Sequence, residues 1–513
     1  MSVLYRPGEG MTYGEATDPL VMENGFIGAK RYTPPLPSFD VSKDLLPAPF
    51  IDGEESFTDC YYRAWEIAFS NLRAPSDASG FCSDFIDTAF NGFLFMWDSA
   101  FIVMFGKYGA RAFDFQATLD NFYARQHPDG FICREICESE GGDQFFRHDP
   151  SSTGPNVLPW AEWTYYENFG DVDRIRKVFP PLLAYHRWLR EHRTWRDGTY
   201  WTTGWGCGMD NSPSLPRGVD PEFSHGHMVW IDACSQAILS GRILAKMARL
   251  IGREDEVRDV AEESDMLAKF VNENMWDEKT GFYYDLRRDG FSGVKTLASY
   301  WTLISGIVPE ERIASFAAHL FNENEFMRPH APATLSADDP DFCPLGGYWR
   351  GAVWAPTAYM VLWGLDSVGM HDEARRIALN HHAAVAAVFR DTGTFFENYA
   401  PDKIARGDKG FSDFVGWSGL PPIAVFLEYV IGIMPDGKNR RIVWRVGDTR
   451  RHGVLKYPLG ADCDLDLICE ARSSDDERPH VTATSLRGPS VTVKVIWSGG
   501  EYEITSTKTE DQE

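Results

Sequence analysis

The sequence predicts an all-α protein built from six helical hairpins in a toroid, followed by a small C-terminal β module. Three observations support this fold class. Twelve segments between residues 57 and 432 carry apolar residues at helical spacing. The connections between these segments alternate between short turns and long loops rich in Trp, Gly, Asp and Asn. After residue 437 the pattern changes to short runs rich in β-branched residues, separated by turn residues.

The predicted helices follow one another from residue 57 onward. The segment 172–193 shows apolar side chains at spacings of three, four and seven, although Pro180 and Pro181 inside it are expected to kink or split the helix. The twelve predicted ranges are 57–73, 95–108, 111–126, 156–169, 172–193, 227–252, 254–276, 294–305, 309–320, 350–369, 371–390 and 413–432.

The alternation of connections predicts where function lies. The short connections follow the even-numbered helices, and nearly all of them place Gly at the helix end, where a left-handed residue closes the cap. Consecutive antiparallel hairpins put every second connection at the same end of the structure. The six long loops are therefore expected to converge around one central pocket. An open helical solenoid is the alternative, and the absence of a repeated consensus argues against it.

The β module and the chain ends complete the predicted organisation. Short strands are predicted at 441–446, 469–472, 481–486 and 491–497. We therefore divide the chain into an N-terminal irregular wrapping segment (1–55), a helical body (56–436), a small β module (437–508) and a disordered tail (509–513).

Composition and charge exclude several classes of partner. Lys and Arg total 50 and Asp and Glu total 75, so the net charge is 50 − 75 = −25. An acidic chain repels nucleic-acid phosphates and anionic membrane surfaces, so we expect neither partner. No apolar run reaches the length of a membrane span, and residues 1–10 lack the pattern of a signal peptide.

The cysteines and the missing cofactor motifs refine this view. Nine scattered cysteines indicate free thiols in a reducing compartment, so we expect a cytoplasmic protein. No cluster has the spacing of metal ligands, and no Gly-rich phosphate loop is present. We therefore expect no metal and no cofactor.

Acids placed between aromatic residues recur in the long loops, at Asp98, Asp210 and Glu397. Trp and Tyr in polar loops are typical of carbohydrate sites, because sugar rings have apolar faces that stack on aromatic planes. A carboxyl group against apolar rings has its pKa raised, which suits a general acid near neutrality. Asp98 alone could cap a helix, and Asp210 could form an Asx-turn. Glu397, within Phe-Phe-Glu-Asn-Tyr, fits neither a solvated face nor a helix repeat.

Four motifs, spread in order over about residues 60–430, resemble those of one enzyme family. They are Trp97-Asp98-Ser99-Ala100-Phe101, Gly208-Met209-Asp210-Asn211-Ser212-Pro213, Tyr348-Trp349-Arg350-Gly351 and Phe396-Glu397-Asn398-Tyr399. The chain is similar to glycoside hydrolase family 63, in the bacterial branch of mannosylglycerate and glucosylglycerate hydrolases, and more distantly to trehalases. The resemblance implies an (α/α)6 barrel and cleavage of α-glycosidic bonds with inversion.

The resemblance also implies roles for individual residues. Asp210 matches the general acid and Glu397 the general base, and Asn211 beside the acid is expected to bind substrate. Trp205 is expected to wall the pocket. Relatives often carry a Glu shortly before the acid motif, whereas this chain reads Trp205-Gly206-Cys207, on the leaving-group side. The positions that match those holding the nonreducing-end sugar are Trp97, Asp98, Gln126, Trp349 and Arg350.

We therefore expect an exo-acting, inverting α-glycoside hydrolase, with an α-glucosidase acting on a short oligosaccharide or glucoside as the first choice. A sugar epimerase or isomerase on the same barrel is one alternative, and it would use His pairs. A non-catalytic carbohydrate-binding protein is a second, and it would have lost one of the two acids. A phosphorylase is a third, and it would need a basic phosphate site in place of Glu397.

Overall fold

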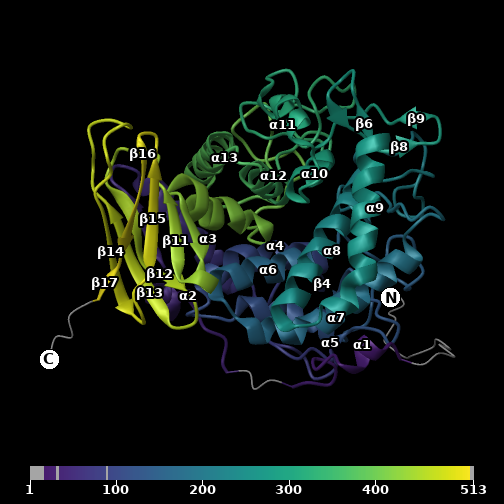
Figure 1. Ribbon diagram of the computed structural model, residues 1–513, viewed down its shortest axis with the longest axis horizontal. Coiled ribbons are helices and arrows are strands. Elements are labelled where there is room, and N and C mark those ends of the chain that lie inside the picture. Colours follow the sequence, from purple (N-terminus) through teal and green to yellow (C-terminus); the bar gives the residue numbers. More distant parts are fainter. Residues whose placement is uncertain (1–16, 31–33, 88–90, 509–513) are drawn as a thin grey trace.

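The computed structural model describes residues 17–30, 34–87 and 91–508. The predicted disordered tail (509–513) and the first sixteen residues of the predicted wrapping segment lie outside these ranges. A body of helices forms most of the molecule, and a β module stands at one end of it (Figure 1). None of the helices in the described ranges is long and apolar enough to cross a membrane.

Most helical elements lie in the predicted ranges, but α1, α2 and η1 fall in the segment 1–55 that was predicted to be irregular, and η9 follows the last predicted helix. The α-helices are α1 (Pro19–Met22), α2 (Phe39–Ser42), α3 (Glu55–Ser70), α4 (Met96–Gly106), α5 (Asp120–Ala124), α6 (Leu158–Phe169), α7 (Val172–His192), α8 (Ile231–Ile251), α9 (Arg258–Asn274), α10 (Trp301–Ile304), α11 (Glu310–Ala318), α12 (Ala355–Ser367) and α13 (His371–Thr392). The 3₁₀ segments are η1 (Lys43–Leu45), η2 (Lys107–Gly109), η3 (Phe115–Leu119), η4 (Glu254–Val257), η5 (Leu297–Tyr300), η6 (His319–Phe321), η7 (Trp417–Gly419) and η9 (Gly437–Asn439), and η8 (Leu420–Val430) is π-helical.

Each of the twelve predicted ranges contains helical structure, and one detail is corrected. The two prolines do not split α7, which runs as one α-helix over Val172–His192. All residues from 178 to 186 are buried, Pro180 and Pro181 included. Packing on all sides of this stretch offsets the backbone hydrogen bonds that the prolines remove.

Six helices contact one another in a closed ring. In order, α4 contacts α6, α6 contacts α8, α8 contacts α10, α10 contacts α12, α12 contacts η8, and η8 contacts α4. These six correspond to the even-numbered predicted helices. The remaining long helices lie against them from outside, with α7 and α9 on α8 and with α3 and α13 on η8. The alternating connections therefore separate an inner set of helices from an outer one.

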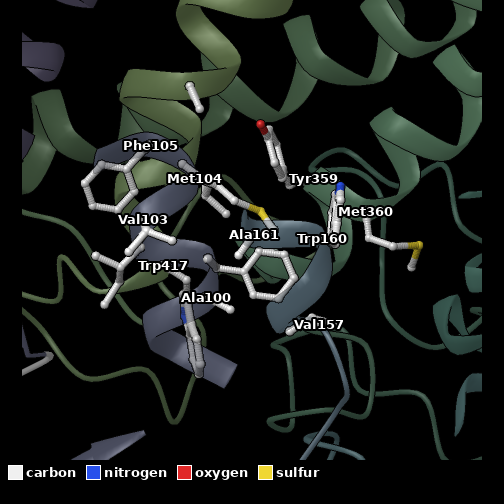
Figure 2. Packing of buried hydrophobic residues seen from close by; sticks show 14 of the residues in the cluster. Ala100, Val103, Met104, Phe105, Val157, Trp160, Ala161, Tyr359, Met360 and Trp417 are labelled. Carbon is white, nitrogen blue, oxygen red and sulfur yellow. The ribbon is translucent and has the colours of Figure 1, made fainter. Parts of the chain in front are cut away.

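The centre of the ring is packed with large apolar side chains. All eleven residues of α4 are buried, as expected for a helix surrounded by others. Side chains of α4, α6 and α12 point toward one another in Figure 2. The Trp160 ring of α6 lies 5.7 Å from Phe101 of α4 and 6.1 Å from Tyr359 of α12, centroid to centroid. This packing fixes the first turns of α4 and α12, where the long loops enter.

Two sheets make up the β module. One has the strand order β1-β12-β13-β14-β17 and the other β10-β11-β15-β16. Trp444 of the second sheet contacts His452 of the first, with ring centroids 5.8 Å apart. The strands are β1 (Ala48–Ile51), β10 (Ile433–Asp436), β11 (Arg441–Arg445), β12 (His452–Leu459), β13 (Cys463–Cys469), β14 (Val481–Arg487), β15 (Thr492–Trp497), β16 (Gly500–Thr505) and β17 (Thr507–Lys508).

The module extends beyond the predicted range 437–508. β1 precedes the helical body in sequence and pairs antiparallel with β12, and β10 pairs with β11. The predicted strand 469–472 is wrong, because β13 ends at Cys469. Alternate burial along β13 shows one face packed inward. Short two-stranded ribbons decorate the helical body: β2 (Leu72–Arg73) with β3 (Phe85–Ile86), β4 (Phe93–Phe95) with β5 (Glu135–Cys137), β6 (Trp276–Asp277) with β7 (Phe282–Tyr283), and β8 (Leu286–Arg287) with β9 (Gly290–Phe291).

Candidate active site

A pocket of about 90 Å³ collects three carboxylates and a wall of aromatic rings. Its residues come from four of the six predicted long loops, from two segments that the sequence did not indicate, around residues 134 and 154, and from the predicted helix 413–432, which contributes Trp417. The pocket is lined by Phe95, Trp97, Asp98, Arg134, Gly154, Pro155, Trp205, Gly208, Asp210, Tyr348, Trp349, Glu397 and Trp417.

A short ribbon places the first two pocket residues. β4 pairs with β5, and the backbone N–H of Met96 then donates to the carbonyl of Arg134 at 2.8 Å. Because α4 begins at Met96, Trp97 and Asp98 lie in its first turn. Asp98 is therefore not a helix cap, since the capping position is Phe95. The same ribbon brings Arg134 to the pocket wall.

The loop that carries Asp210 is held by its own backbone and by a thiol. The Cys207 Sγ donates to the carbonyl of Gly204 at 3.1 Å and accepts from the backbone N–H of Met209 at 3.3 Å. Gly208 has a φ of 79°, and a Cβ there would lie 3.4 Å from the ring of Trp97. Glycine therefore suits both the left-handed backbone and the close approach of the indole.

Asn211 ties this loop to the next one. Its Nδ2 donates to the carbonyl of Gly347 at 2.9 Å, and its Oδ1 accepts from the backbone N–H of Trp349 at 2.8 Å. Asn211 itself does not line the pocket. The structure thus gives this predicted substrate-binding residue a positioning contact, which fixes Asp210 relative to the Trp349 indole.

Glu397 lines the same pocket and is buried, with 3% of its surface exposed. Its Oε1 accepts from the Tyr348 hydroxyl at 3.3 Å, and its Oε2 accepts from the backbone N–H of Phe411 at 3.4 Å. Its backbone N–H and carbonyl are also engaged, by the Phe411 carbonyl at 2.9 Å and by the Trp417 indole N–H at 3.0 Å. This carboxyl is therefore fixed through both its backbone and its side chain.

Burial shifts the titration of all three carboxyls. It raises the pKa of Asp210 to about 7, against a smaller lowering by the Arg134 guanidinium. It also raises the pKa of Glu397 to about 7, against lowering by the Phe411 N–H and the Tyr348 hydroxyl. The pKa of Asp98 is raised well above its ordinary value by burial and by the nearby Glu397 charge. Asp210 and Glu397 can therefore exchange protons near neutral pH.

Six of the nine predicted site residues line this pocket. The other three, Asn211, Gln126 and Arg350, do not. The Gln126 Oε1 accepts from Asn24 Nδ2 at 2.9 Å. Its Nε2 donates to the carbonyls of Gly130 at 3.0 Å and Pro181 at 2.9 Å. Arg350 is exposed, and its Nε donates to the Asn211 carbonyl at 3.3 Å. The amide of Gln126 is thus used within the fold, and the Arg350 side chain is directed outside the pocket lining.

Two of the six predicted loops contribute nothing to the lining, 126–132 and 281–285. In the second, Tyr283 donates through its hydroxyl to Asn272 Oδ1 at 2.6 Å, and Asp285 accepts from the Ile231 backbone N–H at 2.9 Å. The expectation that all six loops meet at one pocket is corrected, because these side chains are committed to the helices beneath them.

The pocket also contains residues that sequence reasoning did not assign to the site. Arg134 is paired with Glu135 at 2.6 Å, and Tyr348 adopts a left-handed φ of 68° that turns its hydroxyl to Glu397. Trp417 lies at the start of the final inner helical segment, η7. Tyr348 stands in an aromatic-rich loop sequence, which is the signal that could have identified it, whereas Trp417 falls inside the predicted helix 413–432. Arg134 carries no such signal, because the ribbon alone brings it in.

A metal role finds no support in this part of the chain. Among the residues that the structure describes, no group of three His, Cys, Asp or Glu side chains could hold a metal ion. All nine cysteines are free thiols, and eight of them are buried. The chemistry available in the pocket is therefore that of its carboxyl, hydroxyl and guanidinium groups.

Comparisons with known proteins point to one family. The mannosylglycerate hydrolase MGH1-like glycoside hydrolase domain matches residues 93–418, more than half of the chain. The chain is 28% identical over 387 residues to the mannosylglycerate hydrolase of Thermus thermophilus, a match covering 62% of this chain and 91% of that protein. It is 26% identical over 283 residues to a probable mannosyl-oligosaccharide glucosidase of Schizosaccharomyces pombe, covering 48% of this chain and 34% of that protein.

The fold agrees with the sequence comparisons. The crystal structure of a family 63 mannosylglycerate hydrolase from Thermus thermophilus, solved in complex with glucose, superposes with a TM-score of 0.58 at 22% identity. The superposition covers 72% of this chain and 99% of that one. The matched range 93–418 contains every residue that lines the pocket. The chain therefore belongs to the mannosylglycerate hydrolase MGH1-like family of glycoside hydrolases, within glycoside hydrolase family 63.

Proposed function

We propose that the protein is an inverting, exo-acting α-glycosidase in which Asp210 is the general acid and Glu397 is the general base. One observation carries the proposal: two carboxyl groups whose pKa values are raised to about 7 share a small pocket walled by indole rings. We also propose that the ring of α4, α6, α8, α10, α12 and η8 is the inner ring of an (α/α)6 barrel.

The surroundings of the two carboxyls support this division of roles. Glu397 accepts hydrogen bonds on both oxygens, and such donors favour the ionised form that a base needs. In the described part of the chain, no other residue donates a hydrogen bond to the Asp210 carboxyl, so burial favours its protonated form. The acid then has a proton to give and the base has a charge with which to take one.

The proposed reaction is a single displacement. A water molecule on the face opposite the leaving group attacks the anomeric carbon, and Glu397 takes the proton that this water loses. The bond between the anomeric carbon and the glycosidic oxygen breaks, and Asp210 donates its proton to that oxygen. The two carboxyls of such a pair lie about 6.5–9.5 Å apart, which leaves room for the water. An α-glycoside is then released as the β-anomer.

The remaining pocket residues have roles that follow from their chemistry. The rings of Trp97, Trp205 and Trp349 form walls against which the apolar face of a sugar can stack. Asp98 can hold a sugar hydroxyl through its oxygens at the end of the pocket near Glu397. Arg134 lies near Asp210, on the side where its charge lowers the pKa of the acid.

We propose an α-glucoside or α-mannoside with a short aglycone as substrate, with glucose as the first choice. The relatives named as mannosylglycerate hydrolases and as a mannosyl-oligosaccharide glucosidase support this range of sugars. The departure at Gly206 and Cys207 lies on the proposed leaving-group side of Asp210. The aglycone is therefore the part of the substrate in which this protein would differ from relatives with a Glu at that point.

The pocket argues against the alternative functions. Its described lining contains no His, whereas an epimerase or isomerase would rely on His pairs. Both acids are in place, which a binding protein would not need to retain. Glu397 occupies the position where a phosphorylase would need a basic phosphate site.

A substrate panel tests the proposal. The purified protein is incubated with α-glucosides and α-mannosides that include glucosylglycerate, mannosylglycerate and trehalose, and free hexose is quantified. We expect release of glucose or mannose from at least one member, and no release by Glu397→Gln or Asp210→Asn. Equal release by the wild type and by Glu397→Gln would contradict the assignment of the base.

A further inference from the structure

A second cavity lies where the helical body meets the β module. It has a volume of about 500 Å³, compared with about 90 Å³ for the carboxylate pocket, and the two share no residue. Its walls come from the start of α13, the end of η8, and the strands and loops of β11 and β15. Its polar wall includes Asp366, His371, Arg375, Tyr429, Arg445 and Arg472.

Hydrogen-bond donors without a partner concentrate in this cavity. In the described part of the chain, five arginines have a buried Nε with no hydrogen-bond partner, and three of them, Arg375, Arg445 and Arg472, line it. Tyr429, which also lines the cavity, is 4% exposed, and its hydroxyl is buried and unpartnered too. The four polar atoms are covered by the surrounding protein, so this wall carries more donors than the described residues satisfy.

Arg375 is the least satisfied of the three arginines. The Arg445 guanidinium reaches Asp366 at 3.5 Å and His371 at 3.3 Å, and Arg472 donates to four backbone carbonyls. Arg375 has no hydrogen bond or ion pair to any described residue. Burial lowers the pKa of its guanidinium, against a smaller raising by the charges of Asp448, Asp372 and Asp475.

The acids around the cavity do not supply the missing acceptor. Asp366 is already engaged by Arg445 and by His371. Glu428 is engaged by Lys107 and by two tyrosine hydroxyls. The three other acids on the wall, Asp372, Glu373 and Asp475, lie at its solvent edge: Asp372 is exposed, Glu373 is partly exposed, and the Asp475 side chain is 73% exposed.

We propose that this cavity binds a small oxyanion, a phosphate or carboxylate group, with the Arg375 guanidinium as the principal ligand and with Arg445 and Arg472 as further positive charges on its wall. A guanidinium presents parallel N–H donors that match the oxygens of such a group. The site is independent of the glycosidase proposal, because no residue is shared.

Gly447 offers a way to displace Arg375 without removing its charge. A Cβ at this position would lie 2.6 Å from both Cζ and Nε of Arg375, so the guanidinium would have to move. The Gly447→Ala and Arg375→Gln variants therefore remove the same contact by different means. Arg441→Gln is the matched control, because Arg441 also has a buried, unpartnered Nε but does not line the cavity.

The test is titration calorimetry of the full-length protein with inorganic phosphate at constant ionic strength, with D-glycerate as the carboxylate arm. We expect saturable binding of phosphate, of glycerate or of both. Glucose is the neutral control: the proposed function places it in the carboxylate pocket, so its binding should be the same in Arg375→Gln and in the wild type. Arg375→Gln and Gly447→Ala should each weaken binding by about 10- to 100-fold, as expected for hydrogen bonds to a charged group. Arg441→Gln and Glu397→Gln should leave it unchanged.

Two results would overturn the proposal. One is a failure to see the expected difference: either the wild type shows no saturable binding, or Arg375→Gln binds as tightly as the wild type while circular dichroism shows that both are folded. The other is loss of anion binding in Glu397→Gln, which would place the anion in the carboxylate pocket instead. Activity toward the substrate panel, measured on Arg375→Gln, should equal that of the wild type, so the glycosidase proposal and this one fail separately.

Discussion

Two buried carboxylates of the helical body, Glu428 and Glu397, differ in how fully the surrounding residues replace their lost hydration. Glu428 of η8 is 2% exposed, and both of its oxygens are engaged. Its Oε1 accepts from Tyr108 at 2.6 Å and pairs with Lys107 Nζ at 3.0 Å, while its Oε2 accepts from Tyr359 at 2.7 Å. Glu397 is as deeply buried, but among the described residues its carboxyl has only two long hydrogen bonds, of 3.3 and 3.4 Å, and no paired cation.

The difference separates a carboxylate that holds the fold from one that can react. The loss of hydration of Glu428 is replaced by one cation and two hydroxyls, so the charge is held in the packed interior. The loss of hydration of Glu397 is replaced only in part, so its pKa rises to about 7 and its proton becomes available near neutrality. The proposed base therefore differs from Glu428 in how little of its lost hydration is replaced, and not in its burial.

The largest effect is expected from Glu397→Gln. The amide keeps the size of the side chain but cannot take a proton from water, so kcat should fall by about 10²–10⁴-fold or more. Binding of the sugar, measured by calorimetry on the inactive variant, should stay close to that of the wild type.

Asp210→Asn separates the acid from the base. This variant should lose activity on glycosides with poor leaving groups and keep much of it on α-glucosyl fluoride, whose leaving group needs no proton. Glu397→Gln should be inactive on both substrates. If Asp210→Asn lost the two activities equally, Asp210 would not be the acid.

Glu428→Gln should instead lower stability. Removing one partner of a buried ion pair leaves the Lys107 charge uncompensated, at a cost of about 3–5 kcal/mol. Urea denaturation followed by fluorescence measures this change in the free energy of unfolding. Glu397→Gln is the control and should not lose stability. A Glu428→Gln protein as stable as the wild type would remove the contrast between the two sites.

The pH dependence should also distinguish the sites. Activity should rise as Glu397 loses its proton and fall as Asp210 loses its own, which gives a narrow bell centred near pH 7. Because the folded pKa of Glu397 lies above its ordinary value of 4.5, the stability this group contributes is fully present below about pH 4 and is lost as the pH rises through about 7. Glu397→Gln should therefore melt above the wild type at pH 8 and level with it at pH 4. A wild type that melts at a higher temperature than Glu397→Gln at pH 8 would contradict this prediction.

The smallest effect is expected from Arg134→Gln. The Arg134 charge lowers the pKa of Asp210, so its removal should raise that pKa and move the alkaline limb of the activity profile to higher pH. The acid limb, set by Glu397, should stay in place. Movement of the acid limb instead would assign the two carboxyls the other way round.

The sequence predicted the helices better than the strands, for a physical reason. A helix is stabilised by local periodicity, which is visible in one segment, and all twelve predicted ranges contain helical structure. Strand β12 includes Gly453, Lys456 and Pro458 and has a register shift between Val454 and Tyr457, so no alternating run marks it. β1 joins the module only through pairing with β12, some 400 residues away in sequence.

Prediction of the site was limited in the same way, because contacts between distant segments are not visible in one stretch of sequence. Acids flanked by aromatic residues predicted Asp98, Asp210 and Glu397, and all three line one pocket. Residue type could not predict how side chains are used within the fold, as with Gln126, whose amide bonds to Asn24 and to two backbone carbonyls. Arg134 was missed because a two-stranded ribbon, and no sequence motif, places it beside Asp210.

The most direct test of the acid–base pair is proton NMR of the first sugar released from the best substrate of the panel. The account predicts the β-anomer as the first product from an α-glycoside, followed by slow mutarotation, because Glu397 directs water to the face opposite the leaving group. First release of the α-anomer would mean retention, and Glu397 could not then be the base that activates water.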